Sequence, residues 1–422
     1  MTGERLRGRV LRNVNGGYGL LRVDGQTVFA RDALKDEDVT VTIQSRRKGV
    51  LFGEVVDVHV AHPQRRTAPC EVAFRCGGCH YQGASAEAQA VAKREGLEEL
   101  LQRAHIETPV SAWHAGPEFG WRARIELHGA RTDDGFALGF FEEKSHRVVP
   151  ARSCLQVSER MRSMIVLFSQ ILDESAARAG SIEVVESFDG EGIVAVASDP
   201  IVAAALRKRA HETYLRGLGV KETRDEARVI HGDLSLDESI GSVKLAHHAM
   251  SFFQANRFMT PALLNGVLEA VGSPGVSDNG RVVDLFCGVG LFAVPLAVAG
   301  HDVTAIEWNQ TAFDDLGRNA KMNGVKVERL PLGVGTALAT GLQVKGSTTI
   351  VDPPRRGLDP IELDAIAAGR PAKIVYVSCD PATLARDLVR FASLGYGSRS
   401  IQAFDMFPTT FHLETLAVLA RD

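Results

Sequence analysis

The 422-residue sequence lacks the features of a secreted or membrane-spanning protein. It has only six cysteines, no recognisable signal peptide and no run of eighteen apolar residues. Structural disulfides are rare in reducing compartments, so the thiols indicate metal binding or catalysis instead. We therefore expect a cytoplasmic chain that does not enter a membrane, and we expect it to be a monomer.

The sequence also lacks internal repeats and low-complexity linkers, although its length exceeds that of one typical domain. We expect four segments with different patterns. They are a small β-barrel over residues 1–66, a cysteine-bearing segment over 67–109, a β-rich region over 110–246 and an α/β domain over 247–422.

The first segment has short alternating runs separated by Gly and Asp turns, which predict an OB-like barrel. The expected strands are residues 6–12, 18–23, 27–30, 38–43 and 51–58. Residues 1–66 carry 12 Lys and Arg against 8 Asp and Glu, a net +4, whereas residues 67–422 carry −8. This concentration of basic residues favours nucleic-acid binding by the barrel, with an ordinary solvated surface as the alternative.

The β-rich region carries less functional information. Its expected elements are strands near residues 121–128, 136–141 and 182–186 and a helix over 159–177. Arg122 and Arg124 alternate onto one strand face, where they would either contact phosphate or form ordinary surface charge.

Four of the cysteines form a pattern of their own. Cys70, Cys76 and Cys79 stand close together, and Cys154 follows at a distance. Four thiols in a chain without structural disulfides predict a metal site. Their spacing fits a tetrahedral zinc ion and an iron–sulfur cluster equally well, and free buried thiols are the remaining alternative.

The last segment begins its pattern with an apolar strand that breaks into Gly288-x-Gly290 before an amphipathic stretch. Such glycines let the backbone approach a ligand at the start of a helix. The third glycine of the dinucleotide fingerprint is missing and Asp284 precedes the turn, which disfavours a pyrophosphate. A second strand ends at Glu307, spaced to accept hydrogen bonds from a ribose. We therefore expect a Rossmann-like nucleotide-cofactor site.

Three later strand ends carry groups that could perform chemistry. Asp352 ends an apolar strand before two prolines and could hold a flat heterocycle by its N–H edge, or be a solvated turn residue. Cys379 ends another strand, where a nucleophile would lie, although a buried structural cysteine is the alternative. His412 and Glu414 would face the same way on a late strand, towards either the site or solvent.

In their order, these motifs resemble the SAM-dependent RNA uracil-C5 methyltransferases, which make 5-methyluridine in tRNA or 23S rRNA. Gln254, within Phe252-Phe-Gln-Ala-Asn256, matches the cofactor-binding glutamine segment of that family. The resemblance covers nearly the whole chain. It implies a class I SAM methyltransferase domain, a TRAM-type barrel that contacts RNA, and a 4Fe–4S cluster rather than zinc at the four cysteines.

The resemblance also implies roles for individual residues. Cys379 would add to C6 of uracil, Glu414 would remove the proton from C5, and Asp352 would grip the base and help to hold SAM. The cofactor would be bound by Gln254, Phe286, Gly288, Gly290, Glu307 and Asp352. Four protein ligands would leave no open iron, which argues against a radical-SAM enzyme and for a structural cluster.

Two other functions remain open from the sequence. Cytosine-C5 methylation of RNA also uses a thiol, but its enzymes place a cysteine after the proline pair, where this chain has Arg355. The chain could also be an inactive RNA-binding or redox-sensing protein, although the intact Cys379 and Glu414 argue against this. The sequence does not distinguish a tRNA target from a 23S rRNA target.

Overall fold

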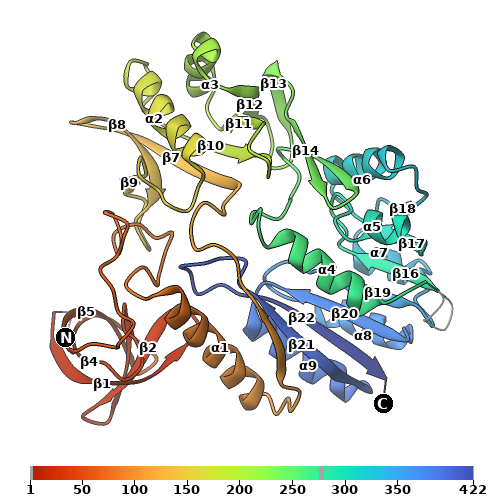
Figure 1. The fold of residues 1–422 in the computed structure, drawn as a ribbon, viewed down its shortest axis with the longest axis horizontal. Coiled ribbons are helices and arrows are strands. Elements are labelled where there is room, and N and C mark those ends of the chain that lie inside the picture. Colours follow the sequence, from red (N-terminus) through yellow and green to blue (C-terminus); the bar gives the residue numbers. More distant parts are fainter. Residues whose placement is uncertain (1–2, 275–279, 422) are drawn as a thin grey trace.

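The computed structural model describes residues 3–274 and 280–421 and arranges them as a barrel and two large sheets with their helices (Figure 1). Residues 1–2, 275–279 and 422, which belong to the first and last expected segments, lie outside the described residues. No helix in the described ranges is long and apolar enough to span a membrane.

The N-terminal strands close into a five-stranded barrel in the order β1-β2-β3-β5-β4, which confirms the OB-like fold expected for this segment. Its strands are β1 (Arg5–Val14), β2 (Tyr18–Val23), β3 (Gln26–Arg31), β4 (Asp38–Arg47) and β5 (Val50–Val60). Alternate residues such as Val10, Leu21 and Val41 point inward and form the barrel core.

Helix α1 (Ala86–Arg103) joins the barrel to the C-terminal part of the chain. It begins where Ser85 accepts a hydrogen bond from the backbone N–H of Ala88, as an N-cap residue does. The helix packs on β1 and also contacts α9 (Pro381–Ser393). In Figure 1 the helix lies between the barrel and the C-terminal sheet.

The middle of the chain forms a seven-stranded sheet in the order β13-β12-β11-β10-β7-β8-β9. Its strands are β7 (Arg124–Thr132), β8 (Gly135–Phe141), β9 (Val148–Pro150), β10 (Ala179–Glu186), β11 (Ile193–Ala197), β12 (Leu215–Lys221) and β13 (Ala227–Gly232). Helices α2 (Glu159–Asp173) and α3 (Pro200–Lys208) contribute to its core, and a 3-10 turn, η1, spans Ala210–Glu212.

Helix α2 ends four residues earlier than the sequence pattern predicts. The guanidinium of Arg131 donates hydrogen bonds to the carbonyls of Leu172, Asp173, Ser175 and Ala177. These carbonyls are satisfied from outside the helix, so the chain can leave the helical path after Asp173.

The C-terminal sheet has eight strands in the order β18-β17-β16-β19-β20-β22-β21-β6. Its strands are β6 (Val110–His114), β16 (Arg281–Leu285), β17 (Asp302–Ile306), β18 (Glu328–Leu330), β19 (Thr348–Val351), β20 (Lys373–Ser378), β21 (Tyr396–Phe404) and β22 (Glu414–Arg421). Strands β16 to β20 are parallel, and β22 runs antiparallel to β20 and β21. This is the expected Rossmann-like architecture.

Helices cover both faces of this sheet. Val282 on β16 points into a core shared with one set of helices, and its neighbour Val283 points into the core on the opposite side. The first set is α4 (Thr260–Val271), α5 (Ala293–Val298) and α6 (Gln310–Met322). The second set is α7 (Val334–Ala339), α8 (Pro360–Ala368) and α9.

The topology differs from the expected segments at two boundaries. Strand β6, expected in the β-rich region, pairs with β21 at the edge of the C-terminal sheet. The boundary at residue 246 cuts β15 (Val243–His248), which forms a hairpin with β14 (Ser235–Ile240). Asn319 on α6 accepts from the backbone N–H of Ala246 and donates to its carbonyl, so the hairpin is fastened to the C-terminal part.

Candidate active site

A pocket lies beyond the carboxyl ends of β16 and β19, where the order of the parallel strands reverses. Open α/β sheets bind their ligands at this point. The lining comes from Phe252, Phe253, Gln254, Phe286, Cys287, Gly288, Val289, Leu291, Phe292 and Asp352. Four of the six residues predicted to bind a cofactor therefore line one pocket.

The glycine turn after β16 has the conformation that its sequence requires. Gly288 and Gly290 have φ values of +54° and +92°. A Cβ on Gly290 would lie 2.6 Å from Leu316, whereas a Cβ on Gly288 would meet no atom within 4 Å. Gly290 is thus needed for packing, and Gly288 leaves open space for a ligand.

Glu307, directly after β17, is fixed to this turn. One carboxylate oxygen accepts from the backbone N–H of Gly288 at 3.0 Å, and the other accepts from Asn309 at 2.6 Å. Burial raises the pKa of the Glu307 carboxyl. Each oxygen can accept a further hydrogen bond, so both hydroxyls of a ribose could be held here.

The Gln254 segment reaches the pocket because it is anchored on two sides. The carbonyl of Ala255 accepts from the backbone N–H of Ala123 at 2.7 Å. The ring of Phe253 stacks on His247, with centroids 4.5 Å apart and an interplanar angle of 5°. These contacts leave Gln254 buried with its side chain at the pocket wall.

Cys379 and Glu414 are brought together by the pairing of β20 and β22. Ser378 pairs with Thr415, and the Thr415 hydroxyl donates to the Ser378 carbonyl at 3.0 Å. One position beyond this pair, Cys379 directly follows β20, and Glu414 is the first residue of β22. Asp352 follows β19, the neighbour of β20. It therefore lies at the same carboxyl ends of the parallel strands, and it lines the cofactor pocket. The thiol therefore lies between the pocket and a buried carboxyl.

Burial dominates the electrostatics of this group. It raises the pKa of Asp352 to about 7, and burial together with the charge of Asp352 raises the pKa of Glu414 well above its ordinary value. Burial, Glu414 and Asp352 raise the pKa of the Cys379 thiol to about 12. Without a ligand, Cys379 is therefore a protonated thiol at neutral pH.

His412 does not share a strand face with Glu414, because β22 begins only at Glu414. The sequence expectation for this pair is wrong, since residue 412 lies in an irregular segment before the strand. Arg355 donates a hydrogen bond to the His412 ring at 2.8 Å, and burial and Arg355 lower the pKa of His412 to about 3. A neutral His412 thus orients Arg355, whose charge acts on Cys379.

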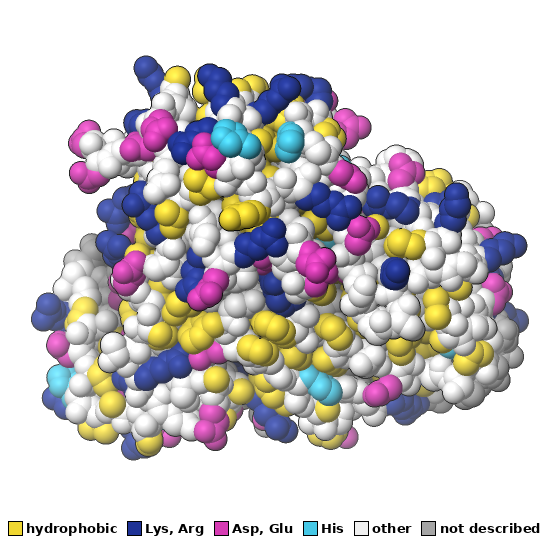
Figure 2. Space-filling model, turned by 45° about the horizontal axis from the view of Figure 1, so that its top comes forward, with side chains coloured by type: hydrophobic (Ala, Val, Ile, Leu, Met, Phe, Trp, Pro, Cys, Tyr) yellow, Lys and Arg dark blue, Asp and Glu magenta, His cyan; other side chains and the backbone are white. Residues whose placement is uncertain are grey.

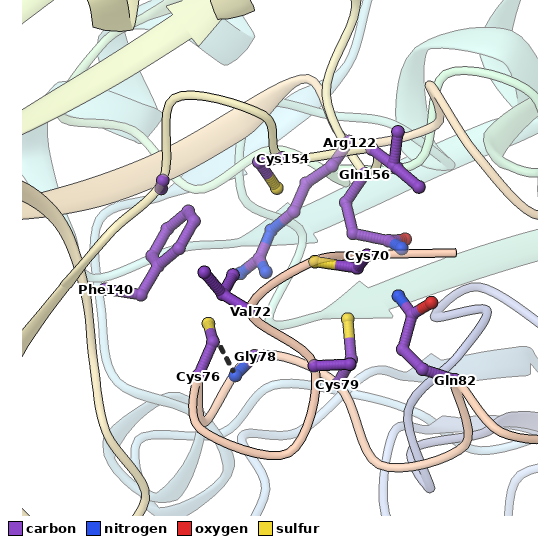
Figure 3. A pocket seen from close by; sticks show the side chains of 13 residues that line it. Cys70, Val72, Cys76, Gly78, Cys79, Gln82, Arg122, Phe140, Cys154 and Gln156 are labelled. Atoms are coloured by element: carbon purple, nitrogen blue, oxygen red, sulfur yellow. Dashed lines mark hydrogen bonds between the residues drawn. The ribbon is translucent and has the colours of Figure 1, made fainter. Parts of the chain in front are cut away.

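The four predicted metal ligands line a second cavity, shown in Figure 3. Cys70, Cys76 and Cys79 lie on one loop, and Cys154 approaches from the opposite side. The Thr409 hydroxyl donates to the Cys79 sulfur at 3.1 Å. In residues 3–274 and 280–421, no three His, Cys, Asp or Glu side chains are placed to hold a single metal ion.

Comparison with known proteins gives one consistent family. The sequence profile described as tRNA (Uracil-5-)-methyltransferase matches residues 341–422, and that of the TRM5/TYW2 methyltransferase domain matches 272–333. The chain is 32% identical to the 23S rRNA (uracil(1939)-C(5))-methyltransferase RlmD of Pseudomonas putida, over 99% of this chain and 94% of the relative. The chain belongs to the RNA uracil-C5 methyltransferase family. An uncharacterized RNA methyltransferase of Halalkalibacterium halodurans is 30% identical over 96% of this chain and 94% of its own length.

A solved structure supports the same family. The tRNA (uracil-54, C5)-methyltransferase of Pyrococcus abyssi, in complex with S-adenosyl-L-homocysteine, matches with a TM-score of 0.77 and 25% identity. The match covers 98% of this chain and 99% of that one. The barrel, the central sheet and the methyltransferase domain are therefore all part of the shared fold.

Sequence reasoning misjudged two arginines of this family member. The side chain of Arg124 pairs with Glu183 at 2.6 Å and donates to the Ser251 carbonyl, so it is engaged within the protein. Arg122 lines the cysteine cavity rather than a surface. Neither of the two alternatives from the sequence, contact with phosphate or ordinary surface charge, describes these side chains. Alternation along a strand gives the face of a residue, but not what covers that face.

The raised pKa of Cys379 predicts a slow, steeply pH-dependent alkylation by iodoacetamide in the free enzyme. Only the thiolate reacts. As long as the pH is below the pKa, the thiolate fraction rises about tenfold for each unit by which the pH increases. At neutral pH the reaction should be at least about a hundredfold slower than that of free cysteine. Mass spectrometry of the Cys379 peptide measures the rate, with glutathione as the control. A plateau below about pH 9 would contradict the protonated thiol.

Proposed function

We propose that this chain transfers a methyl group from S-adenosylmethionine to C5 of a uridine in RNA, through a covalent bond between Cys379 and C6. The observation that carries the proposal is the placement of Cys379 opposite buried Glu414, beside the pocket that Asp352 lines. This reaction requires a nucleophile, a carboxyl and a cofactor pocket close together, and here all three lie at the carboxyl ends of the parallel strands.

Several features of the pocket fit S-adenosylmethionine. Its aromatic and aliphatic walls suit an adenine, and Glu307 retains acceptor capacity for a ribose. Gly288 leaves space against the turn, and Gln254 can donate and accept hydrogen bonds there. When bound, the cofactor supplies an electrophilic methyl group on a sulfonium.

In the first step, the half-buried Cys379 thiol releases its proton to solvent water and its sulfur bonds to C6 of uracil. The C5=C6 electron pair then moves towards C5 and O4, and C5 becomes the nucleophile that accepts the methyl group. Asp352 holds the N–H edge of the base, which fixes C6 near the sulfur. Arg355 offsets the negative charge around Cys379.

Glu414 performs the final proton transfer. After methylation C5 still carries its proton, and the carboxylate removes it while the C5=C6 bond re-forms and the sulfur leaves C6. Glu414 is 2% exposed, and its Oε1 has no hydrogen-bond partner among the described residues. The raised pKa of Glu414 makes it a stronger base once it is ionised.

The barrel supplies a surface for RNA. Many of its basic side chains form internal ion pairs, such as Arg7 with Asp38 and Arg65 with Glu37. Further exposed basic residues on its strands and turns are Arg5, Arg22, Arg46, Arg47 and Lys48. Figure 2 shows Lys and Arg interleaved with Asp and Glu on the viewed face. Local basic groups rather than net charge would therefore guide the RNA.

The test is methylation of total RNA from a strain that lacks the enzyme, with the purified protein and labelled S-adenosylmethionine. We expect 5-methyluridine at a defined site, and mapping then distinguishes 23S rRNA from tRNA, the targets named for the two relatives. Incorporation as 5-methylcytidine would support the cytosine alternative. Cofactor binding with no incorporation into any RNA would support an inactive protein.

The four cysteines are proposed to hold a 4Fe–4S cluster. They line one cavity rather than converging on a point, which suits a cluster better than a single zinc ion. The cluster would join the loop of Cys70 to Cys79 with the segment of Cys154. We also propose that the protein is a cytoplasmic monomer, a setting in which such a cluster is compatible with reduced thiols.

Protein purified without oxygen is expected to be brown and to contain about four iron and four sulfide per chain. Replacing Cys76 with serine should lower both contents and the soluble yield, because ligand binding at such a site is also folding energy. Metal analysis and the melting temperature measure this. Cys287→Ser is the matched control for metal content, since this thiol lies in the cofactor turn. Stoichiometric zinc under iron-replete conditions would contradict the cluster.

A further inference from the structure

Arg122 is unusual among the enclosed basic residues because the groups whose charge acts on it are the thiols of Cys154, Cys79 and Cys76. Arg257 pairs with Glu186, and Lys93 pairs with Asp405. In the part of the chain that the structure describes, no carboxylate forms an ion pair with Arg122. Its Nε donates to the Arg124 carbonyl at 3.1 Å, and the rest of the guanidinium points into the cysteine cavity (Figure 3). A buried guanidinium needs a negative partner.

Two other polar groups of this cavity, the Gln156 amide and the Gly78 backbone, have N–H donors there. The indole N–H of Trp121 donates to the Gln156 Oε1, which fixes the amide. The Nε2 of Gln156, a residue only 4% exposed, has no partner within residues 3–274 and 280–421. Gly78 donates its backbone N–H to the Cys76 sulfur at 3.4 Å. The cavity thus presents a cation and N–H groups to whatever the sulfurs bind.

We propose that Arg122 is the counter-ion of the 4Fe–4S cluster and raises its reduction potential, with Gln156 adding an N–H donor. The inference rests on the cluster proposed above. Four thiolates carry more negative charge than the iron–sulfur core balances, and one-electron reduction adds further negative charge. A fixed cation and N–H donors stabilise the reduced form more than the oxidised form.

The backbone around Arg122 connects this site to the cofactor segment. The backbone of Arg122 forms an antiparallel β-bridge with that of Asn256, and Arg257 donates its backbone N–H to the Trp121 carbonyl at 3.1 Å. The side chain of Arg122 nevertheless lines the cysteine cavity and is not part of the lining of the cofactor pocket. Replacing the side chain should therefore change the cluster and leave cofactor affinity unchanged.

The test is a redox titration of anaerobically purified full-length protein, followed by visible and electron paramagnetic resonance spectra. In Arg122→Met protein the equilibrium constant for one-electron reduction should fall at least tenfold, which lowers the midpoint potential by 59 mV or more. Arg122→Lys keeps the charge and should shift the potential less. Arg207→Met, which removes an exposed charge at the end of α3, is the matched control and should leave it unchanged.

The outcomes separate this inference from the cluster proposal. If wild-type protein purified without oxygen contains no iron and sulfide, the proposal of a cluster is wrong. Full iron content and an unchanged potential in Arg122→Met would overturn the role of Arg122 alone. If Arg122→Met does not assemble a cluster, Arg122→Gln and Gln156→Met take its place, and unchanged potentials in both would overturn the inference. An unchanged dissociation constant for S-adenosylmethionine verifies that the strand pairing is intact.

Discussion

Replacing Cys379 with alanine is expected to abolish RNA methylation while S-adenosylmethionine still binds. Without the sulfur, C5 of uracil is not activated, so the rate should fall by on the order of 10⁶-fold, as it does when other enzymes lose a nucleophile. The thiol lies at the end of β20, whereas Gln254 and Glu307 approach the cofactor from other segments. Single-turnover methylation and calorimetric cofactor binding measure the two effects separately.

RNA containing 5-fluorouridine at the target site provides the complementary result. Fluorine replaces the C5 proton that the base must remove, and a base cannot remove fluorine in the same way. Wild-type protein should therefore remain bonded to the RNA through Cys379. The matched variant Cys287→Ala changes the other thiol near the pocket and should still form this adduct. Near-normal methylation by Cys379→Ala, or an adduct mapped to Cys287, would remove Cys379 from the mechanism.

Replacing Glu414 with glutamine should stop the reaction after methyl transfer and before product release. Addition of Cys379 and transfer of the methyl group do not need this carboxylate, but loss of the C5 proton does. A covalent protein–RNA adduct, already methylated at C5, should accumulate on ordinary uridine RNA. Release of product should slow by about 10²- to 10⁴-fold, the usual contribution of a general base. Denaturing gels and mass spectrometry of the adduct measure this.

His412→Asn is the control for Glu414→Gln, because His412 lies two residues away and contacts Arg355. It should slow the reaction less and should not accumulate a methylated adduct. Free 5-methyluridine produced by Glu414→Gln at the wild-type rate, with no adduct, would exclude Glu414 as the base.

Local patterns were sufficient to predict the elements that carry the site. The expected strand over residues 18–23 is β2, and the glycine turn and Glu307 lie where a strand, turn, helix and strand would place them. Alternation and turn residues act over a few positions, so they can be recognised without knowledge of the fold. Helix α2 was predicted too long because its end depends on Arg131, a residue of another element.

The sequence by itself determined the barrel, the Rossmann-like domain and the identity of the reactive groups, because each follows from residue types at short spacing. Only the tertiary structure decided which distant groups meet. Thr409 reaches Cys79, β6 joins β21, and Arg122 turns its charge towards the cysteines. Pairing between strands far apart in the chain depends on the packing of the whole molecule, and no short stretch of sequence encodes it. For the same reason the pairing of β20 with β22, and not the motif around Cys379, places Glu414 beside the thiol.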